Sequence, residues 1–452
     1  MNAAAHLQAR TLIEVYVHRN TCLISTHHNR KDNSEKNNEH AKKWIREKIG
    51  TLDAHKDYIE IWKLSSSYGL NDFMQNFIYA LSFPNFVVTD WGAKAVWRED
   101  GGKVLALSTS RVEQTGSANA LWWYFGPNDE RTIKSVENIN NLHAHWAKQY
   151  PGAFSYNEDY VYVCAFAAIT IHRLEVKIGV PDISEKEKIA SHLFWRDMAK
   201  LFRAENDQPI TGYPDSFEGL VKFCEDYEST PRPFFERANL VVSALHGQFV
   251  FRFPPPQLHW FGHQLIRAMS LPTTLKTVQI DPPDPMAAEI LPKLMGYIFW
   301  QMEENSDDPT DAYIEERLQM SSDDKARIRA EHKELDARFP EHFISKYKND
   351  AKLVGCPYHA MLTAADSDFR TGSDQGSLEE LERNAGVLPG QQGTCETDRQ
   401  FMPACPGSYP GTSPSILIAQ SLQTPSFYVG IYRSMPTARA PFLFCLHTTE
   451  AE

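Results

Sequence analysis

The chain lacks the sequence patterns that mark several large protein classes. Its seven cysteines include no CxxC pair, and it contains no GxxxxGKS phosphate loop, no GxGxxG fingerprint and no GxSxG element. These absences count against zinc-ribbon proteins, nucleotide-binding enzymes and serine hydrolases. Scattered cysteines in an odd number are typical of a reducing compartment, so we expect an intracellular protein rather than a secreted one.

Long hydrophobic runs and excess positive charge are also missing. No stretch reaches the roughly 18 uninterrupted apolar residues of a membrane span, and the nearest, 160–171, is followed by His172 and Arg173. The N-terminal sequence MNAAAHLQARTLIEVYVHRN lacks the apolar core of a signal peptide. We therefore expect a soluble protein and leave peripheral membrane association open. A net charge of −12 without a basic stripe argues against nucleic-acid binding.

What the sequence does contain is helical periodicity, since 42% of its 452 residues are apolar and recur mostly at helical spacing. The expected helices cover 72–84, 111–125, 128–147, 159–171, 184–201, 216–224, 239–251, 258–269 and 286–301. Because strand alternation is scarce, the predicted fold class is all-α.

The composition divides the chain into four parts. Residues 1–50 form a polar segment, and residues 51–301 form the helical domain. Residues 302–350 are charged and predict a solvated outer helix around 314–339. Residues 351–452 are rich in Gly, Pro, Ser and Thr, which is typical of a tail of low order.

Three residues of the helical domain form the candidate site. Arg111 and Thr115 are four residues apart, so a helix places them on one face. His143 lies on an apolar stripe of the next helix, and Asn140 on the same stripe is a candidate to orient its ring. A histidine on an apolar face next to an Arg/Thr pair allows an iron ligand beside a polar, oxygen-handling surface. Taken alone, the pattern favours a core histidine bonded to a backbone carbonyl, with Arg111 paired to a carboxylate and Thr115 bonded to its own helix.

Other histidines compete for the role of ligand. His172, within the apolar stretch, is the main rival for an axial position, and His246 is a weaker one. His145 belongs to a His143-Ala144-His145 pattern, but on a helix the two side chains diverge. His259 and His263 have the i,i+4 spacing of a zinc site, yet they lack the glutamate of HExxH. The simpler interpretation of this pair is two partly exposed histidines.

The order and spacing of these motifs resemble the catalytic domain shared by MpaB-type fungal oxygenases and the bacterial rubber oxygenase, also called latex clearing protein. The resemblance covers roughly 58–300. The segments that carry it are Arg111-x-x-x-Thr115, Tyr124-Phe125-Gly126, Asn141-Leu142-His143-Ala144, Phe194-Trp195-Arg196 and Phe253-Pro254-Pro255.

The resemblance implies a single, globin-reminiscent helical domain that binds haem b and uses O₂ to oxidise or cleave an isoprenoid double bond. By motif match, His143 becomes the proximal iron ligand, and Arg111 and Thr115 lie near the haem. The rubber oxygenase has a lysine where this chain has Gln114, and its upstream glutamate has no clear counterpart near 94–97. These departures favour a smaller, fungal-type hydrophobic metabolite of secondary metabolism over rubber as the substrate.

The resemblance also suggests a cellular location, and two alternative functions remain open. Fungal relatives are often held at the endoplasmic reticulum, and no anchor is visible here, so the expected location is cytoplasmic or peripheral to that membrane. One alternative is a non-haem metal enzyme that uses His259 and His263. The other is a non-catalytic helical binding protein that has lost the cofactor.

Overall fold

A computed structural model of the chain describes residues 42–347, which belong to one compact unit. Sixteen α-helices and one short hairpin, made of two strands of two residues each, occupy this part of the chain. The predicted all-α class is therefore confirmed. None of these helices is both long and apolar enough to cross a bilayer. The predicted tail, 351–452, and most of the predicted polar segment, 1–41, lie outside the described residues.

The first half of the described chain contains eight helices and leads to the predicted site. They are α2 (Trp44–Thr51), α3 (Tyr58–Ser67), α4 (Asp72–Ser82), α5 (Asp90–Trp97), α6 (Gly102–Ala106), α7 (Ser108–Phe125), α8 (Glu130–Gln149) and α9 (Asn157–Ile178). A short 3₁₀ turn, η1 (Phe83–Phe86), follows α4.

The second half of the described chain contains the remaining elements. Its elements are α10 (Glu185–Ala199), β1 (Arg203–Ala204), η2 (Glu205–Asp207), β2 (Gln208–Pro209), α11 (Phe217–Ser229), α12 (Glu236–Arg252), η3 (Pro256–Leu258), α13 (His259–Met269), α14 (Pro272–Thr277), α15 (Pro285–Asn305), α16 (Tyr313–Gln319) and α17 (Ser322–Tyr347). Strand β1 pairs with β2 in antiparallel register.

Local sequence signals fix where several helices begin and end. Asn71 accepts a hydrogen bond from the Met74 amide at the start of α4, as an N-cap does. Ser184 and Glu187 form a capping box at the start of α10. Helix α7 ends at Gly126, whose φ of 80° is a conformation that favours glycine.

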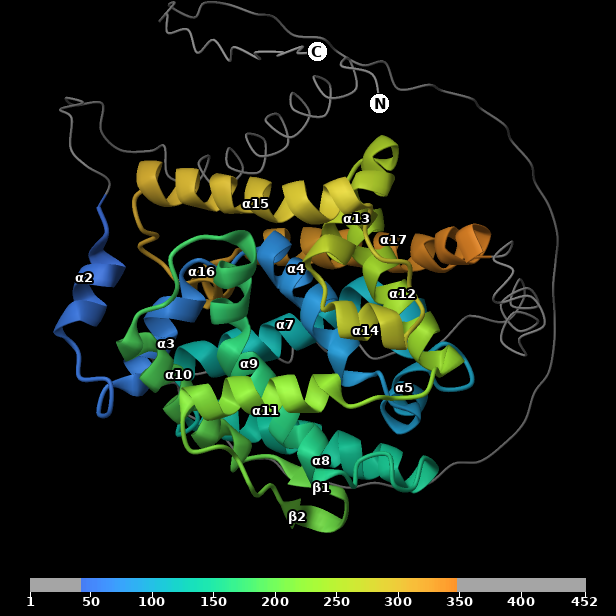
Figure 1. Ribbon diagram of the computed structural model, residues 1–452, viewed down its shortest axis with the longest axis horizontal. Helices are drawn as coiled ribbons and strands as arrows, with labels where there is room; N and C mark the ends of the chain where they lie inside the picture. The colour runs from blue at the N-terminus through green and yellow to red at the C-terminus, as the bar shows by residue number, and fades with distance from the viewer. Residues whose placement is uncertain (1–41, 348–452) are drawn as a thin grey trace, which may run out of the picture. The chain divides into compact units, whose positions relative to one another are not determined.

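The central helices are α7 and α9, which Figure 1 shows between α15 on one side and α8 with the hairpin on the other. Helix α9 packs against α10 and α11, and α7 packs against α3, α4 and α17. The main cluster of buried side chains includes Trp62, Tyr162, Phe166 and Phe194. Cys164 is buried within it, as expected for a cysteine acting as a small apolar residue.

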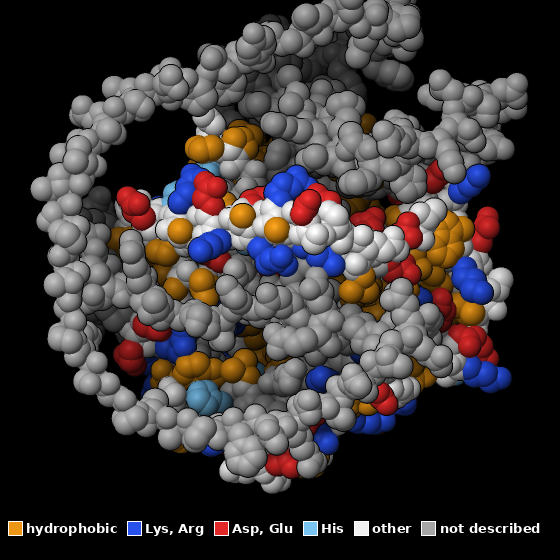
Figure 2. Space-filling view, turned by 180° about the vertical axis from the view of Figure 1, so that it is seen from behind, with side chains coloured by type: hydrophobic (Ala, Val, Ile, Leu, Met, Phe, Trp, Pro, Cys, Tyr) orange, Lys and Arg blue, Asp and Glu red, His pale blue; other side chains and the backbone are white. Residues whose placement is uncertain are grey.

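The two ends of the helical body add detail to the expectation from composition. The charged region forms two helices, α16 and α17, rather than a single one around 314–339. Helix α17 exposes most of its charged side chains, as an outer helix does, but its inner face buries Phe339 and Phe343 against α12. The polar segment likewise ends in an ordered helix, α2, where the Lys42 amide hydrogen-bonds Asp307 after α15. Elsewhere, charged side chains of both signs mix with hydrophobic ones on the surface (Figure 2).

Candidate functional site

One large cavity lies among the central helices. Its volume is about 2680 Å³, well above the roughly 300–1,000 Å³ of a typical small-molecule pocket. Aromatic and aliphatic side chains provide most of its wall, among them Phe83, Trp123, Trp146 and Phe166. The space also reaches exposed charged side chains, among them Arg46, Glu303 and Lys333, so it is open to solvent rather than a closed pocket. Arg111, Thr115 and His143 all line it.

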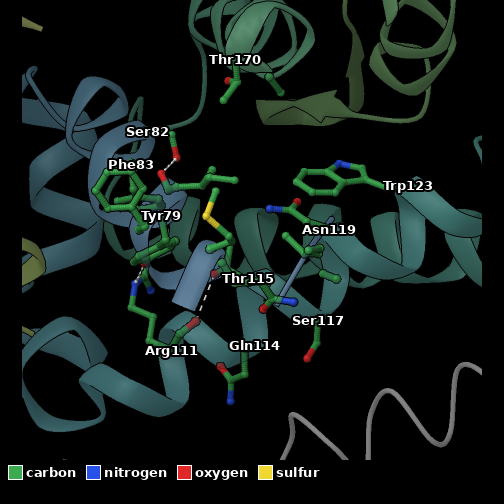
Figure 3. A pocket seen from close by; sticks show the side chains of 18 of the residues that line it. Tyr79, Ser82, Phe83, Arg111, Gln114, Thr115, Ser117, Asn119, Trp123 and Thr170 are labelled. Atoms are coloured by element: carbon green, nitrogen blue, oxygen red, sulfur yellow. Dashed lines mark hydrogen bonds between the residues drawn. The ribbon is translucent and has the colours of Figure 1, made fainter. Parts of the chain in front are cut away.

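Helix α7 presents the Arg/Thr pair to the cavity beside α4 (Figure 3). Nε of Arg111 donates a hydrogen bond to the Tyr79 hydroxyl at 2.9 Å, and the guanidinium lies 4.9 Å from the centre of the Phe83 ring. Arg111 forms no ion pair with any carboxylate within 42–347. Its terminal nitrogens therefore remain able to bind an acidic group of a ligand.

The Thr115 hydroxyl has a more ordinary partner. It donates to the Arg111 carbonyl oxygen at 3.1 Å, which is the common back-bond of a helical threonine. Its lone pairs remain available, because the oxygen uses its proton in this bond. Two further α7 side chains, Asn119 and Trp123, lie on the side that faces Thr170 of α9, whereas Gln114 points away (Figure 3).

His143 lies on the stripe of α8 that borders the same cavity. Its ring stacks on Phe154 with centroids 4.6 Å apart, and Nδ1 lies 3.4 Å from the Tyr160 hydroxyl. Burial lowers the pKa of His143 to about 4, so the imidazole is neutral at neutral pH. No hydrogen bond from residues 42–347 engages Nε2, and this leaves a lone pair or a proton for a ligand in the cavity.

Asn140, which was predicted to orient the His143 ring, forms its hydrogen bonds with another part of the chain. The Asn140 amide donates to the Leu201 carbonyl oxygen at 2.9 Å, and its oxygen accepts from the Arg203 amide at 3.1 Å. Asn140 therefore fixes the start of the hairpin rather than the imidazole, because its side chain leaves α8 on the side of that loop. The ring is positioned by Phe154 and Tyr160, which come after α8 in the chain.

The rival histidines are placed differently. His172 is not deep in the core: its side chain is 22% exposed, and Nδ1 lies 2.7 Å from Asp182. His246 is fully buried on α12, but it is not among the residues that line the cavity. His145 is exposed on the far side of α8 from the cavity. None of these three therefore shares a site with Arg111.

The His259 and His263 pair lies on α13, away from the cavity lining. Nε2 of His263 contacts the Lys346 ammonium, and the His259 ring lies 5.6 Å from that of His342. Among the described residues, no group of three or more His, Cys, Asp or Glu side chains is arranged to hold a metal ion.

Sequence reasoning missed several polar residues of the cavity, among them Tyr79 and His332. Tyr79 precedes Arg111 by 32 residues, and no motif links them. His332 of α17 also lines the cavity; it is 5% exposed, and burial lowers its pKa to about 4. Its Nε2 lies 3.1 Å from an Arg252 nitrogen, so this imidazole already has a partner. The only sequence signal for His332 was its place on the inner stripe of an amphipathic helix.

The residues present fit a haem group. The observation that tests this is the state of His143. Its ring is neutral, its Nε2 forms no hydrogen bond with residues 42–347, and it lines the largely apolar cavity. Arg111 supplies a cationic group of the kind that binds a propionate.

Comparisons with known proteins give no family assignment. No family model matches the chain, and no curated protein is significantly similar to it in sequence.

Proposed function

We propose that the chain is a haem b-dependent oxygenase that acts with O₂ on a hydrophobic, isoprenoid-bearing small molecule of secondary metabolism. The observation that supports the proposal most is the shared cavity. A neutral imidazole on α8 and a guanidinium on α7 that has no carboxylate partner within 42–347 line one space whose wall is largely apolar.

Each residue has a role that follows from its contacts. His143 would hold the iron through Nε2 while Tyr160 and Phe154 fix the ring. Arg111, oriented by Tyr79, would bind a propionate or another acidic group. Thr115 would accept a hydrogen bond from a polar group in the cavity, because its own proton is engaged. When bound, haem would supply the oxygen-activating chemistry, and the protein would provide ligation, orientation and exclusion of water.

The wall of the cavity bears on the substrate. Phe83, Phe166 and Trp123 offer apolar surface that suits a prenyl chain. Gln114, which stands where the rubber oxygenase has a lysine, cannot supply that cationic group. This difference supports a small prenylated metabolite over a polymer.

A haem titration tests the proposal. The full chain, purified and supplemented with haem, should acquire a Soret band and one iron per chain. We expect His143→Ala to lose the band, and the matched variant His145→Ala, on the exposed face of the same helix, to keep it. A wild-type protein that folds but binds no haem would refute the proposal. Bound zinc or non-haem iron lost in His263→Ala would indicate the metal enzyme instead.

A further inference from the structure

A second group of basic side chains lies outside the cavity, where three helices meet. Helix α12 contributes one member, α13 three and α17 two, and α12 packs against both of the other helices. We call these residues the basic cluster: His246, His259, His263, Arg267, His342 and Lys346. None of them lines the cavity that contains His143.

The members of the basic cluster lie close to one another. The Lys346 ammonium donates to Nε2 of His263, and the rings of His259 and His342 meet edge to face. Burial, and after it Lys346, His246, Arg267 and His259, lowers the pKa of His263 to about 3. Burial is also the main cause of the lowered pKa of His246 and Lys346, and Arg267 adds to it. A mutual effect of this kind requires proximity.

No opposite charge balances the cluster. Within residues 42–347, none of its six members forms an ion pair with an aspartate or glutamate, although the chain as a whole carries a net charge of −12. By contrast, Lys222 pairs with Asp226 at 2.8 Å. Because burial keeps His246 and His263 neutral, the cations of the cluster are Arg267 and Lys346. Two cations without a carboxylate partner among the described residues attract an anionic ligand.

The cluster also contains buried nitrogens without a hydrogen-bond partner. They are Nε2 of His246, Nε2 of His259 and Nε of Arg267. His246 itself is only 3% exposed, so bulk water does not form the hydrogen bond that its Nε2 lacks. An unsatisfied buried polar group costs about 1–3 kcal/mol, and three in one place call for a common partner.

We propose that the basic cluster is a binding site for a phosphate group, carried by a small soluble molecule or by a lipid headgroup. Arginine and lysine are cationic donors to phosphate oxygens, and a neutral imidazole offers one further N–H donor. A cation is disfavoured here because Arg267 has no lone pair to offer and Lys346 already occupies the lone pair of His263. The site is independent of the haem proposal, because the two share no residue.

The test measures binding of inorganic phosphate and pyrophosphate to the full chain by calorimetry, with sodium chloride at equal ionic strength as the reference. Vesicles of phosphatidylcholine with and without phosphatidic acid test the lipid source. Lys346→Gln removes an exposed member of the cluster with little risk to folding. Lys222→Gln is the matched control, because it removes a lysine that is already paired.

We expect phosphate or phosphatidic acid to bind the wild-type protein, and Lys346→Gln to weaken the binding about tenfold. Lys222→Gln should change affinity less than twofold, and both variants should bind haem as the wild type does. His263→Gln provides a second variant, which should weaken phosphate binding if its circular dichroism is unchanged. The proposal is overturned if none of these phosphates binds, or if Lys346→Gln and Lys222→Gln bind equally well.

Discussion

The hydroxyl of Tyr79 accepts a hydrogen bond from Nε of Arg111 at 2.9 Å, and this contact ties α4 to α7 at the wall of the cavity. Because Nε is engaged, the guanidinium lies over the Phe83 ring and keeps its two terminal nitrogens for a ligand. Tyr79 thus acts as a positioning residue for Arg111.

We expect Tyr79→Phe to lower haem affinity about threefold and the free energy of unfolding by about 1 kcal/mol, since one hydrogen bond is lost. Arg111→Gln should lower haem affinity about tenfold. In the Arg111→Gln background, Tyr79→Phe should have no further effect on affinity, and a double-mutant cycle with haem titration measures this. Additive effects of the two substitutions would contradict the positioning role.

The sequence predicts helices well because their signals are local. The capping box of Ser184 and Glu187 and the glycine after α7 lie within a few residues of the helix ends that they determine. The partners of the candidate site are not local: Tyr79 meets Arg111 across 32 residues, and Asp336 meets Ser110 across 226. Such contacts depend on how helices pack, which a single sequence does not encode in any short pattern.

Asp336 of α17 caps the start of α7. Its carboxylate accepts hydrogen bonds from the Thr109 amide at 2.7 Å and from the Ser110 hydroxyl at 2.5 Å. We expect Asp336→Ala to lower the free energy of unfolding by about 1–2 kcal/mol, as loss of an N-cap does. Glu334→Ala, at an exposed position of the same helix, should change it by less than about 0.5 kcal/mol. Urea denaturation measures both, and equal effects would contradict the cap.

Buried neutral histidines should make the protein sensitive to mild acid. Burial lowers the pKa of His143 and His332 to about 4 and that of His246 to about 3, whereas an unfolded histidine titrates near about 6.5. As pH falls below about 6.5, the unfolded chain therefore takes up protons that the folded chain does not. The stability that these groups contribute is complete above about pH 6.5 and is lost toward pH 4.

The expected decrease in the free energy of unfolding is up to about 1.4 kcal/mol per pH unit for each such group. Urea denaturation between pH 7.5 and 5 measures the slope. His332→Gln should reduce the slope, because it removes one of the titrating groups. A free energy of unfolding that is the same at pH 5 and pH 7 would show that these imidazoles are not buried in their neutral form.

Glu113 and Arg317 form a buried ion pair between α7 and α16, with side chains only 1% and 8% exposed. The Ser117 hydroxyl also donates to the same Glu113 oxygen. We expect Arg317→Met to lower the free energy of unfolding by about 3–5 kcal/mol, because it leaves a buried carboxylate without its counter-charge.

The double variant Glu113→Gln with Arg317→Met should recover at least half of that loss, since no uncompensated charge remains. Lys293→Met removes one partner of an exposed pair with Glu289 and should cost less than about 1 kcal/mol. Chemical denaturation of the four proteins distinguishes these outcomes. If Arg317→Met were no more destabilising than Lys293→Met, the Glu113 carboxylate would have access to water. In that case α16 would not bury the Glu113 side chain of α7.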